Sequence, residues 1–124
     1  MQIVLLCGGE GKRLKSLESV MPKGMMRING KPFFDYLLNS LKTYKFNSIH
    51  ICLGYKSEFF IDFLKNYQFD IPISYTVETG SKLLGTGGAI RNSLDYLNDN
   101  FIVQYGDTIL DINYEFLFNF HLKN

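Results

Sequence analysis

The 124-residue sequence has no tryptophan, few prolines and almost no net charge, with 13 lysines and arginines against 12 aspartates and glutamates. A formal charge of +1 gives no field that would favour nucleic acid or an anionic membrane as the partner. No apolar run approaches the roughly 20 residues that cross a bilayer, and the opening apolar run is too short for a signal peptide. We therefore expect a cytoplasmic protein that binds neither nucleic acid nor membrane and whose anion site is local.

Cysteine and histidine are too scarce for a metal cluster or a redox motif. The two cysteines, Cys7 and Cys52, lie in separate apolar segments without a C-x-x-C spacing, and the chain has only two histidines. We interpret both cysteines as buried free thiols in a reducing compartment.

The sequence does contain a regular alternation of two patterns. Apolar segments rich in β-branched and aromatic residues alternate with segments of helical period, which indicates a mainly parallel sheet covered by helices. Strands are predicted at residues 2–7, 48–53, 73–77 and 101–105. Helices are predicted from Pro32, over 58–67, over 86–97 and after Asn113. We expect one α/β unit over residues 1–124, a Rossmann-like three-layer sandwich, with most of its 11 phenylalanines and 8 tyrosines in the core.

Two of the predicted helices carry specific expectations. In the helix over 86–97, Thr86 is the expected N-cap and Ile90, Leu94 and Leu97 form the expected buried face. In the last helix, Asn113 is the expected N-cap, and apolar residues follow on more than one side of the helix.

A glycine-rich stretch, GGEG at residues 8–11, follows the first predicted strand and is followed by Lys12 and Arg13. Glycines let backbone N–H groups approach phosphate oxygens, and an arginine holds a phosphate with a planar fork. A P-loop is excluded because Leu6 and Arg13 stand where it needs glycine and a hydroxyl residue. The stretch is a candidate phosphate loop, and the alternative is a tight turn with solvated charges.

Two further loops offer nucleotide contacts. Lys23 lies in a long non-periodic connection and can place a point charge on a phosphate; solvent exposure is the alternative. Residues 84–89, LGTGGA, open a helix with small residues that let a flat ligand approach the backbone. Just upstream, Glu78 can accept two hydrogen bonds from the donor edge of guanine, or it is a solvated loop residue.

The fourth candidate is Gly106-Asp107, at the end of the last predicted strand. The carboxyl ends of parallel strands share one edge of a sheet, so Asp107 would project into the same region as the other loops. A carboxylate there suits Mg²⁺, which is held by one or two carboxylates together with substrate phosphates. A turn-forming aspartate is the alternative.

In this order, the segments resemble the sugar-1-phosphate nucleotidyltransferase family, and most closely its heptose 1-phosphate guanylyltransferase branch. The resemblance rests on LCGGEGKRL at 6–14, Pro22-Lys23, Gly30-Lys31-Pro32, LGTGGA at 84–89 and Gly106-Asp107. The branch is indicated by RLKS at 13–16 and GTGGAI at 85–90.

The resemblance implies roles for particular residues. It implies that Arg13, Lys23 and Asp107 are catalytic, with Asp107 binding Mg²⁺ and Lys23 bridging the α-phosphate and the sugar phosphate. It also implies a nucleotide site made by Leu6, Gly8, Gly9, Gly11, Arg13, Lys23, Glu78, Gly85, Thr86 and Gly88. The implied substrates are a nucleoside triphosphate, by preference GTP, and a sugar 1-phosphate.

The chain departs from the family pattern in two positions and in its length. Lys12 replaces the usual threonine before the arginine, and Gly24 replaces the proline, alanine or glutamine after the lysine. Family catalytic domains are about twice this long, and the other half carries the sugar pocket and a second metal-binding aspartate. We expect the nucleotide-binding N-terminal part of such a domain, forming a homo-oligomer; the alternative is a non-catalytic nucleotide-binding or assembly module of the same fold.

Overall fold

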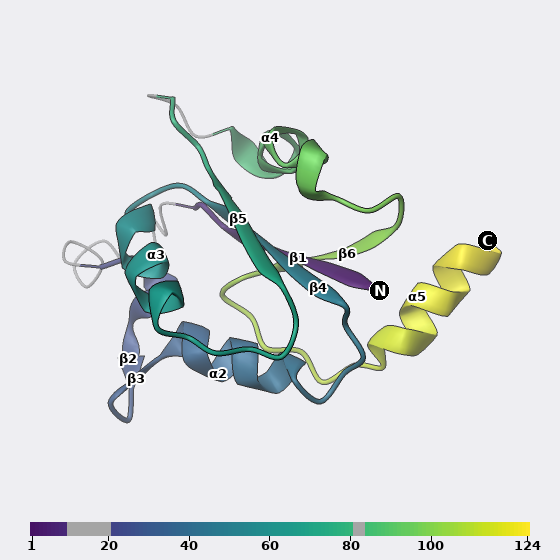
Figure 1. The fold of residues 1–124 in the computed structure, drawn as a ribbon, viewed down its shortest axis with the longest axis horizontal. Coiled ribbons are helices and arrows are strands. Elements are labelled where there is room, and N and C mark those ends of the chain that lie inside the picture. The colour runs from purple at the N-terminus through teal and green to yellow at the C-terminus, as the bar shows by residue number, and fades with distance from the viewer. Residues whose placement is uncertain (10–20, 81–83) are drawn as a thin grey trace.

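The computed structural model describes residues 1–9, 21–80 and 84–124 (Figure 1). Its sheet has four parallel strands, β1 (Gln2–Cys7), β4 (Ser48–Leu53), β5 (Ile73–Val77) and β6 (Phe101–Tyr105). They are ordered β5-β4-β1-β6, so β1 pairs with both β4 and β6. All four strands have the bounds predicted from the sequence.

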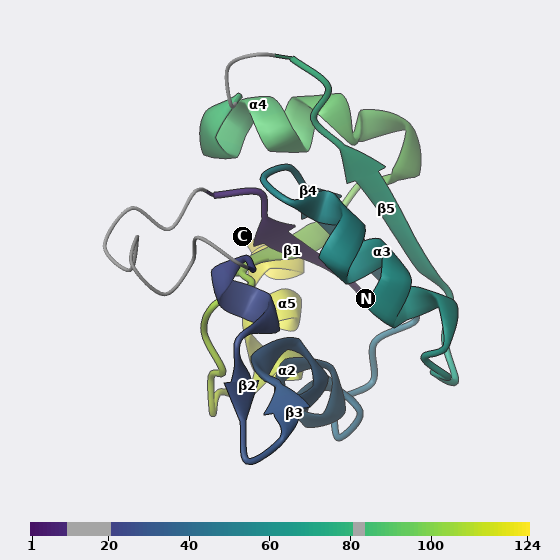
Figure 2. The same ribbon diagram turned by 90° about the vertical axis from the view of Figure 1, so that its left-hand side faces the viewer.

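Helices cover both faces of this sheet, as the three-layer prediction requires. The helices α2 (Phe33–Leu41) and α3 (Ser57–Lys65) lie on one face, and α4 (Gly85–Asn92) lies on the other (Figures 1 and 2). The last helix, α5 (Tyr114–Lys123), follows β6, and the Asn113 side chain caps it by accepting a hydrogen bond from Phe116 N at 2.9 Å. The cap at Asn113 is therefore confirmed.

A short hairpin before α2 was missed by the sequence analysis. Strands β2 (Arg27–Ile28) and β3 (Lys31–Pro32) pair antiparallel, and a 3₁₀ turn, η2 (Lys23–Met25), precedes them. Asn29 and Gly30 both have positive φ, at 51° and 81°, which is the two-residue turn that an Asn-Gly pair favours. Because the hairpin holds Pro32, α2 begins one residue later than expected.

The predicted helix over 86–97 is wrong in its cap and its length, and its expected buried face is confirmed only in part, because Ile90 and Leu97 are half-buried. Leu84, not Thr86, is the N-cap residue, and α4 ends at Asn92, followed by a 3₁₀ turn, η3 (Leu94–Tyr96). The buried residues are Ala89 and Ser93, whereas the side chain of Leu94 is 59% exposed. Small residues let α4 approach the sheet closely, and the tighter winding after Ser93 turns Leu94 outward.

The two faces of the sheet differ in chemistry. Toward α2 and α3, the strands present an apolar core that includes Ile3, Leu5, Ile49, Ile51 and Leu53. Toward α4, the buried apolar cluster is limited to Val4, Cys52 and Ala89, with Leu6, Leu97 and Phe101 beside it. The α4 face also carries buried polar residues, among them Gln2 and His50.

Both cysteines are free thiols, as predicted. Cys52 is buried on the α4 face, whereas Cys7 is only partly buried because it borders the cleft described below. Burial raises the pKa of each thiol above its ordinary value. In the described part of the chain, no helix is both long enough and apolar enough to span a membrane.

The buried His50 predicts a loss of stability in mild acid. Burial lowers the pKa of the folded imidazole, so the unfolded state takes up a proton first as the pH falls. The contribution of neutral His50 to the free energy of unfolding should be fully present above about pH 6.5, which is the ordinary pKa of histidine in the unfolded state. Below that pH the free energy of unfolding should decrease by at most about 1.4 kcal/mol per pH unit. Urea unfolding between pH 7.5 and 5.5 should show this slope, and His50→Gln should reduce it.

The matched control is His121→Gln, because His121 lies on the exposed surface of α5. That variant should retain the pH dependence of the unmodified chain. An unchanged slope in His50→Gln would contradict the prediction.

Candidate functional site

A cleft of about 260 Å³ opens at the carboxyl ends of the strands. The chain leaves β1 toward β4 and β5 and then returns to β6 on the opposite side of β1, so the strand order reverses at β1. Such a reversal leaves a crevice between loops that diverge, and ligands bind there in doubly wound folds. Most predicted site residues line this cleft, namely Leu6, Gly8, Gly9, Lys23, Glu78, Gly85, Thr86 and Asp107.

Of the remaining predicted site residues, two lie outside the described part of the chain and one, Gly88, is described but does not line the cleft. Gly11 and Arg13 lie outside the described residues. Gly88 packs inside the first turn of α4, where a β-carbon would lie 2.5 Å from Leu84 Cβ. Since no real β-carbon approaches so closely, Gly88 allows the chain to enter α4 and has a structural role in the described site.

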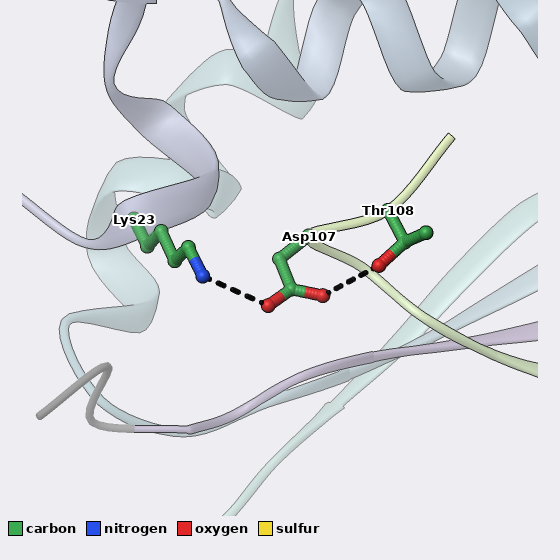
Figure 3. A network of polar contacts seen from close by, with 3 residues as sticks. All are labelled: Lys23, Asp107 and Thr108. Carbon is green, nitrogen blue, oxygen red and sulfur yellow. Dashed lines mark hydrogen bonds and ion pairs between the residues drawn. The ribbon is translucent and has the colours of Figure 1, made fainter. Parts of the chain in front are cut away.

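The predicted cation and anion of the cleft, Lys23 and Asp107, face each other. Lys23 Nζ, from η2, donates to Asp107 Oδ2 at 3.1 Å, and Thr108 Oγ1 donates to Asp107 Oδ1 at 3.0 Å (Figure 3). Burial alone would raise the pKa of Asp107, but the two hydrogen bonds and the charge of Lys23 outweigh it and hold the pKa below its ordinary value. Asp107 is therefore a carboxylate at neutral pH.

This ion pair can exchange its partners at little cost. The side chains of Lys23 and Asp107 are 46% and 43% exposed, and exposed pairs contribute only about 0–1 kcal/mol. A phosphate that takes Lys23 and a cation that takes Asp107 would replace the pair without leaving a buried charge unpaired.

The turn that carries Asp107 is held by buried polar contacts. Gln104 Nε2 donates to the Thr108 carbonyl at 2.8 Å, and the Tyr114 hydroxyl at the start of α5 donates to Gln104 Oε1. At the other end of the turn, Gly106 N donates to Leu6 O at 2.9 Å, which ties the loop to the end of β1. The turn that carries Asp107 is thus fixed relative to the end of β1.

Glu78 has a structural contact as well as a place in the cleft. Its Oε2 accepts from Leu84 N at 3.1 Å, which sets a negative charge at the N-terminus of α4. Its Oε1 lies over the glycine loop, where a β-carbon on Gly8 would lie 3.5 Å from it. The sequence analysis anticipated the position of Glu78 but not its contact with the start of α4.

The cleft is also lined by Cys7, Pro22, Ala89 and Gly106, which belong to the predicted motifs without an assigned role, and by Gly24, Phe60 and Tyr105, which sequence reasoning did not assign to it. Several are chain neighbours of predicted residues and could have been found by adjacency. Phe60 had no such signal, because it follows the helical period of α3. Its ring packs against Gly24, where a β-carbon would lie 3.0 Å from Phe60 Cζ.

The residues present fit a magnesium site completed by substrate. Among the residues that the structure describes, no group of three or more histidine, cysteine, aspartate or glutamate side chains could hold a metal alone. Asp107 supplies one accessible carboxylate oxygen donor, the ligand type that Mg²⁺ takes together with phosphate oxygens and water.

Comparison with known proteins gives a consistent family match. Residues 2–124 match the family model described as nucleotidyl transferase. The chain is 38% identical over 113 residues to the D-glycero-alpha-D-manno-heptose 1-phosphate guanylyltransferase of Campylobacter jejuni, covering 91% of this chain and 50% of that protein. It is 33% identical to the enzyme of the same name from Aneurinibacillus thermoaerophilus, covering 99% of this chain and 53% of that protein.

A solved structure agrees with these matches. The crystal structure of HddC from Yersinia pseudotuberculosis complexed with GMP-PN is 36% identical and superposes with a TM-score of 0.84, covering 98% of this chain and 54% of that one. The chain therefore spans about half the length of the curated relatives and of the solved structure that it matches.

The contact between Gly106 and Cys7 predicts a pair of compensating variants. A β-carbon on Gly106 would lie 2.1 Å from Cys7 Sγ and 3.1 Å from Leu6 O. Gly106→Ala should therefore lower the free energy of unfolding by about 1–3 kcal/mol, as overpacking does. Cys7→Ala in the same chain should recover part of that loss because it removes Sγ.

Gly87→Ala provides the control, because a β-carbon there meets nothing within 4 Å. In urea unfolding this variant should change stability by no more than about 1 kcal/mol. Equal losses at both glycines, or no recovery in the double variant, would contradict the proposed packing.

Proposed function

The chain belongs to the nucleotidyl transferase family, and we propose that its cleft binds a nucleoside triphosphate for transfer of its nucleotidyl group to a sugar 1-phosphate. The observation that carries this proposal is the meeting of Lys23 and Asp107 beside the end of β1, at the point where the strand order reverses. The described part of the site offers glycine backbone, the cation Lys23 and the carboxylate Asp107, which are the groups that a polyphosphate and its metal require, and Glu78 is a second carboxylate beside the start of α4.

The proposed reaction is an in-line displacement at the α-phosphorus. A phosphate oxygen of the sugar 1-phosphate attacks, a new oxygen–phosphorus bond forms, and the bond to the β-phosphate oxygen breaks to release pyrophosphate. Lys23 would hold the α-phosphate and the sugar phosphate together and offset the negative charge that accumulates between them. Arg13, from the resemblance, would hold the triphosphate.

Asp107 would hold magnesium in this scheme. When bound, Mg²⁺ neutralises phosphate charge and orients the triphosphate. Thr108 and the Gln104 contact keep the carboxylate in place, while the pair with Lys23 keeps it ionised before substrate arrives.

Guanine is the base that we propose for this site. Glu78 lines the cleft beside Gly85 and Thr86 at the start of α4, and a carboxylate accepts hydrogen bonds from the paired donors on the guanine edge. The proposal is also supported by the guanylyltransferase names of the Campylobacter and Aneurinibacillus relatives.

Because the chain spans about half the length of its relatives, two functions are considered for it. We expect the 124-residue chain to bind Mg-NTP without turnover, since the sugar pocket and a second carboxylate are implied in the remainder of family domains. The alternative is a non-catalytic nucleotide-binding module. Pyrophosphate release on addition of sugar phosphates would favour the enzyme over the module for the chain itself.

Glu78→Gln tests the base assignment. The amide keeps an oxygen for the Leu84 N–H and so preserves the start of α4, but it loses the charge that pairs with guanine donors. By calorimetry, the Kd for Mg-GTP should rise about 5- to 150-fold, which corresponds to about 1–3 kcal/mol, while the Kd for Mg-UTP changes little.

Glu58→Gln is the control, because Glu58 is exposed in the first turn of α3 and the substitution makes the same change in charge. It should leave both dissociation constants unchanged. Equal weakening of GTP and UTP binding by Glu78→Gln would remove the base-reading role.

We also propose that the chain self-associates through the surface of β6 and α5. Large apolar side chains are exposed there, including Phe116 at 69% and Phe120 at 57%. Among the described strands β6 pairs only with β1, so one edge of this strand is open to pairing. An apolar face beside an open strand edge favours association.

Replacing both Phe116 and Phe120 with serine should shift the chain toward monomer in sedimentation velocity at a fixed concentration. Ile28→Ser on β2 is a control for the loss of a large apolar side chain elsewhere on the surface, since Ile28 is 49% exposed, and it should leave the sedimentation coefficient unchanged. If the unmodified chain is monomeric at about 100 μM, the proposal is contradicted. A dimer with a Kd of about 1 μM requires only about 8 kcal/mol of association free energy and would be mostly assembled at that concentration.

A further inference from the structure

A chain of hydrogen bonds crosses from the sheet to α4 on the polar face. His50 lies fully buried on β4, between two hydroxyl residues of β5: Nδ1 lies 2.8 Å from Ser74 Oγ, and Nε2 lies 3.1 Å from Thr76 Oγ1. Thr76 Oγ1 lies 2.6 Å from Ser93 Oγ, and Ser93 Oγ donates to the Ala89 carbonyl of α4 at 3.0 Å. The contacts connect two strands to the body of the helix.

The directions of the bonds are assigned from the better donor to the Ala89 carbonyl: Ser93 Oγ lies 3.0 Å from Ala89 O, whereas Cys52 Sγ, a weaker donor, lies 3.8 Å from it and 3.3 Å from Ser93 Oγ. On this assignment the single hydroxyl proton of Ser93 goes to Ala89 O. Thr76 must then donate to Ser93, which leaves Thr76 Oγ1 as an acceptor for His50. The proton of the neutral imidazole therefore lies on Nε2, and Nδ1 accepts from Ser74. Each proton is used once, and each buried group has a partner.

This polar chain matters because little else holds α4 to the sheet. The buried apolar cluster between them is small, and α4 contributes only Ala89 to its buried members. Further contacts lie just after the helix, in the turn η3. There the ring of His50 stacks on that of Tyr96 with 5.1 Å between their centroids, and Gln2 Nε2 donates to Tyr96 O at 3.0 Å. The other end of α4 supplies Gly85 and Thr86 to the cleft.

We infer that His50, Thr76 and Ser93 are positioning residues, which set the place of α4 and through it the nucleotide affinity of the cleft. None of the three is among the described residues that line the cleft, so an effect on affinity must pass through α4. The inference about affinity rests on the proposed nucleotide function, whereas the place of α4 can be measured in the chain without ligand.

The first test uses the chain without nucleotide. In nitrogen-15 NMR, His50 should show a protonated Nε2 and an unprotonated Nδ1 at pH 7.5. Thr76→Val, which keeps the shape and removes the hydroxyl, should accelerate hydrogen exchange of the α4 amides relative to those of α2. Thr76→Ser, which restores a hydroxyl, should return exchange to the original rate.

The second test measures affinity for Mg-GTP. Thr76→Val and Ser93→Ala should each raise its Kd by about 2- to 12-fold, the effect expected from one hydrogen bond. Because both variants remove the contact between Thr76 and Ser93, the loss in the double variant should be smaller than the sum of the two single losses. Ser40→Ala is the matched control, since Ser40 Oγ donates to the Leu37 carbonyl within α2, away from the cleft.

The outcomes separate this inference from the proposed function. A proton on Nδ1 of His50, or α4 exchange unchanged by Thr76→Val, would overturn the positioning role. The proposed effect on nucleotide affinity would be overturned if the losses of Mg-GTP affinity were additive in the double variant. An equal loss of affinity in Ser40→Ala would also overturn it. Failure of the unmodified chain to bind GTP would instead overturn the proposed function.

Discussion

The parallel pairing of β1 with both β4 and β6 is the constraint on which the rest of the structure depends. It places strand order reversal at β1, so the loops after β1 and β6 diverge and leave the cleft between them. The two loops are tied by the bond from Gly106 N to Leu6 O, and the close packing of Gly106 against Cys7 leaves no room for a side chain. Asp107 and the glycine loop therefore reach the same site because of backbone pairing.

The sheet was predictable and the details of its polar face were not. β1, β4, β5 and β6 are rich in apolar, β-branched and aromatic residues, which identifies strands, and their bounds agree with the prediction. The error at α4 arose because an apolar period was assumed to mark the buried side. Ala89 and Ser93 are buried instead, because hydrogen bonds to Thr76 hold a helix of small residues against this face.

The candidate site was predictable where its residues belong to motifs at strand ends. Lys23 is the informative case, since a lysine in a non-periodic segment has no periodic signal, yet it meets Asp107 across the cleft. The family resemblance placed Lys23 and Asp107 in one site, because it implied that both contact the same nucleotide and its metal. The contact of Glu78 with Leu84 N and the place of Phe60 depend on tertiary packing, and no local pattern encodes them.

We propose that this cleft takes a magnesium-bound nucleoside triphosphate. It is tested most directly by titrating the nitrogen-15-labelled chain with Mg-GTP and following its backbone amide signals. The account predicts saturable shifts together at Gly8, Gly9, Gly85 and Gly106, with the amides of α5 unmoved. Shifts centred on α5, or no shift at the cleft glycines with millimolar Mg-GTP, would contradict it.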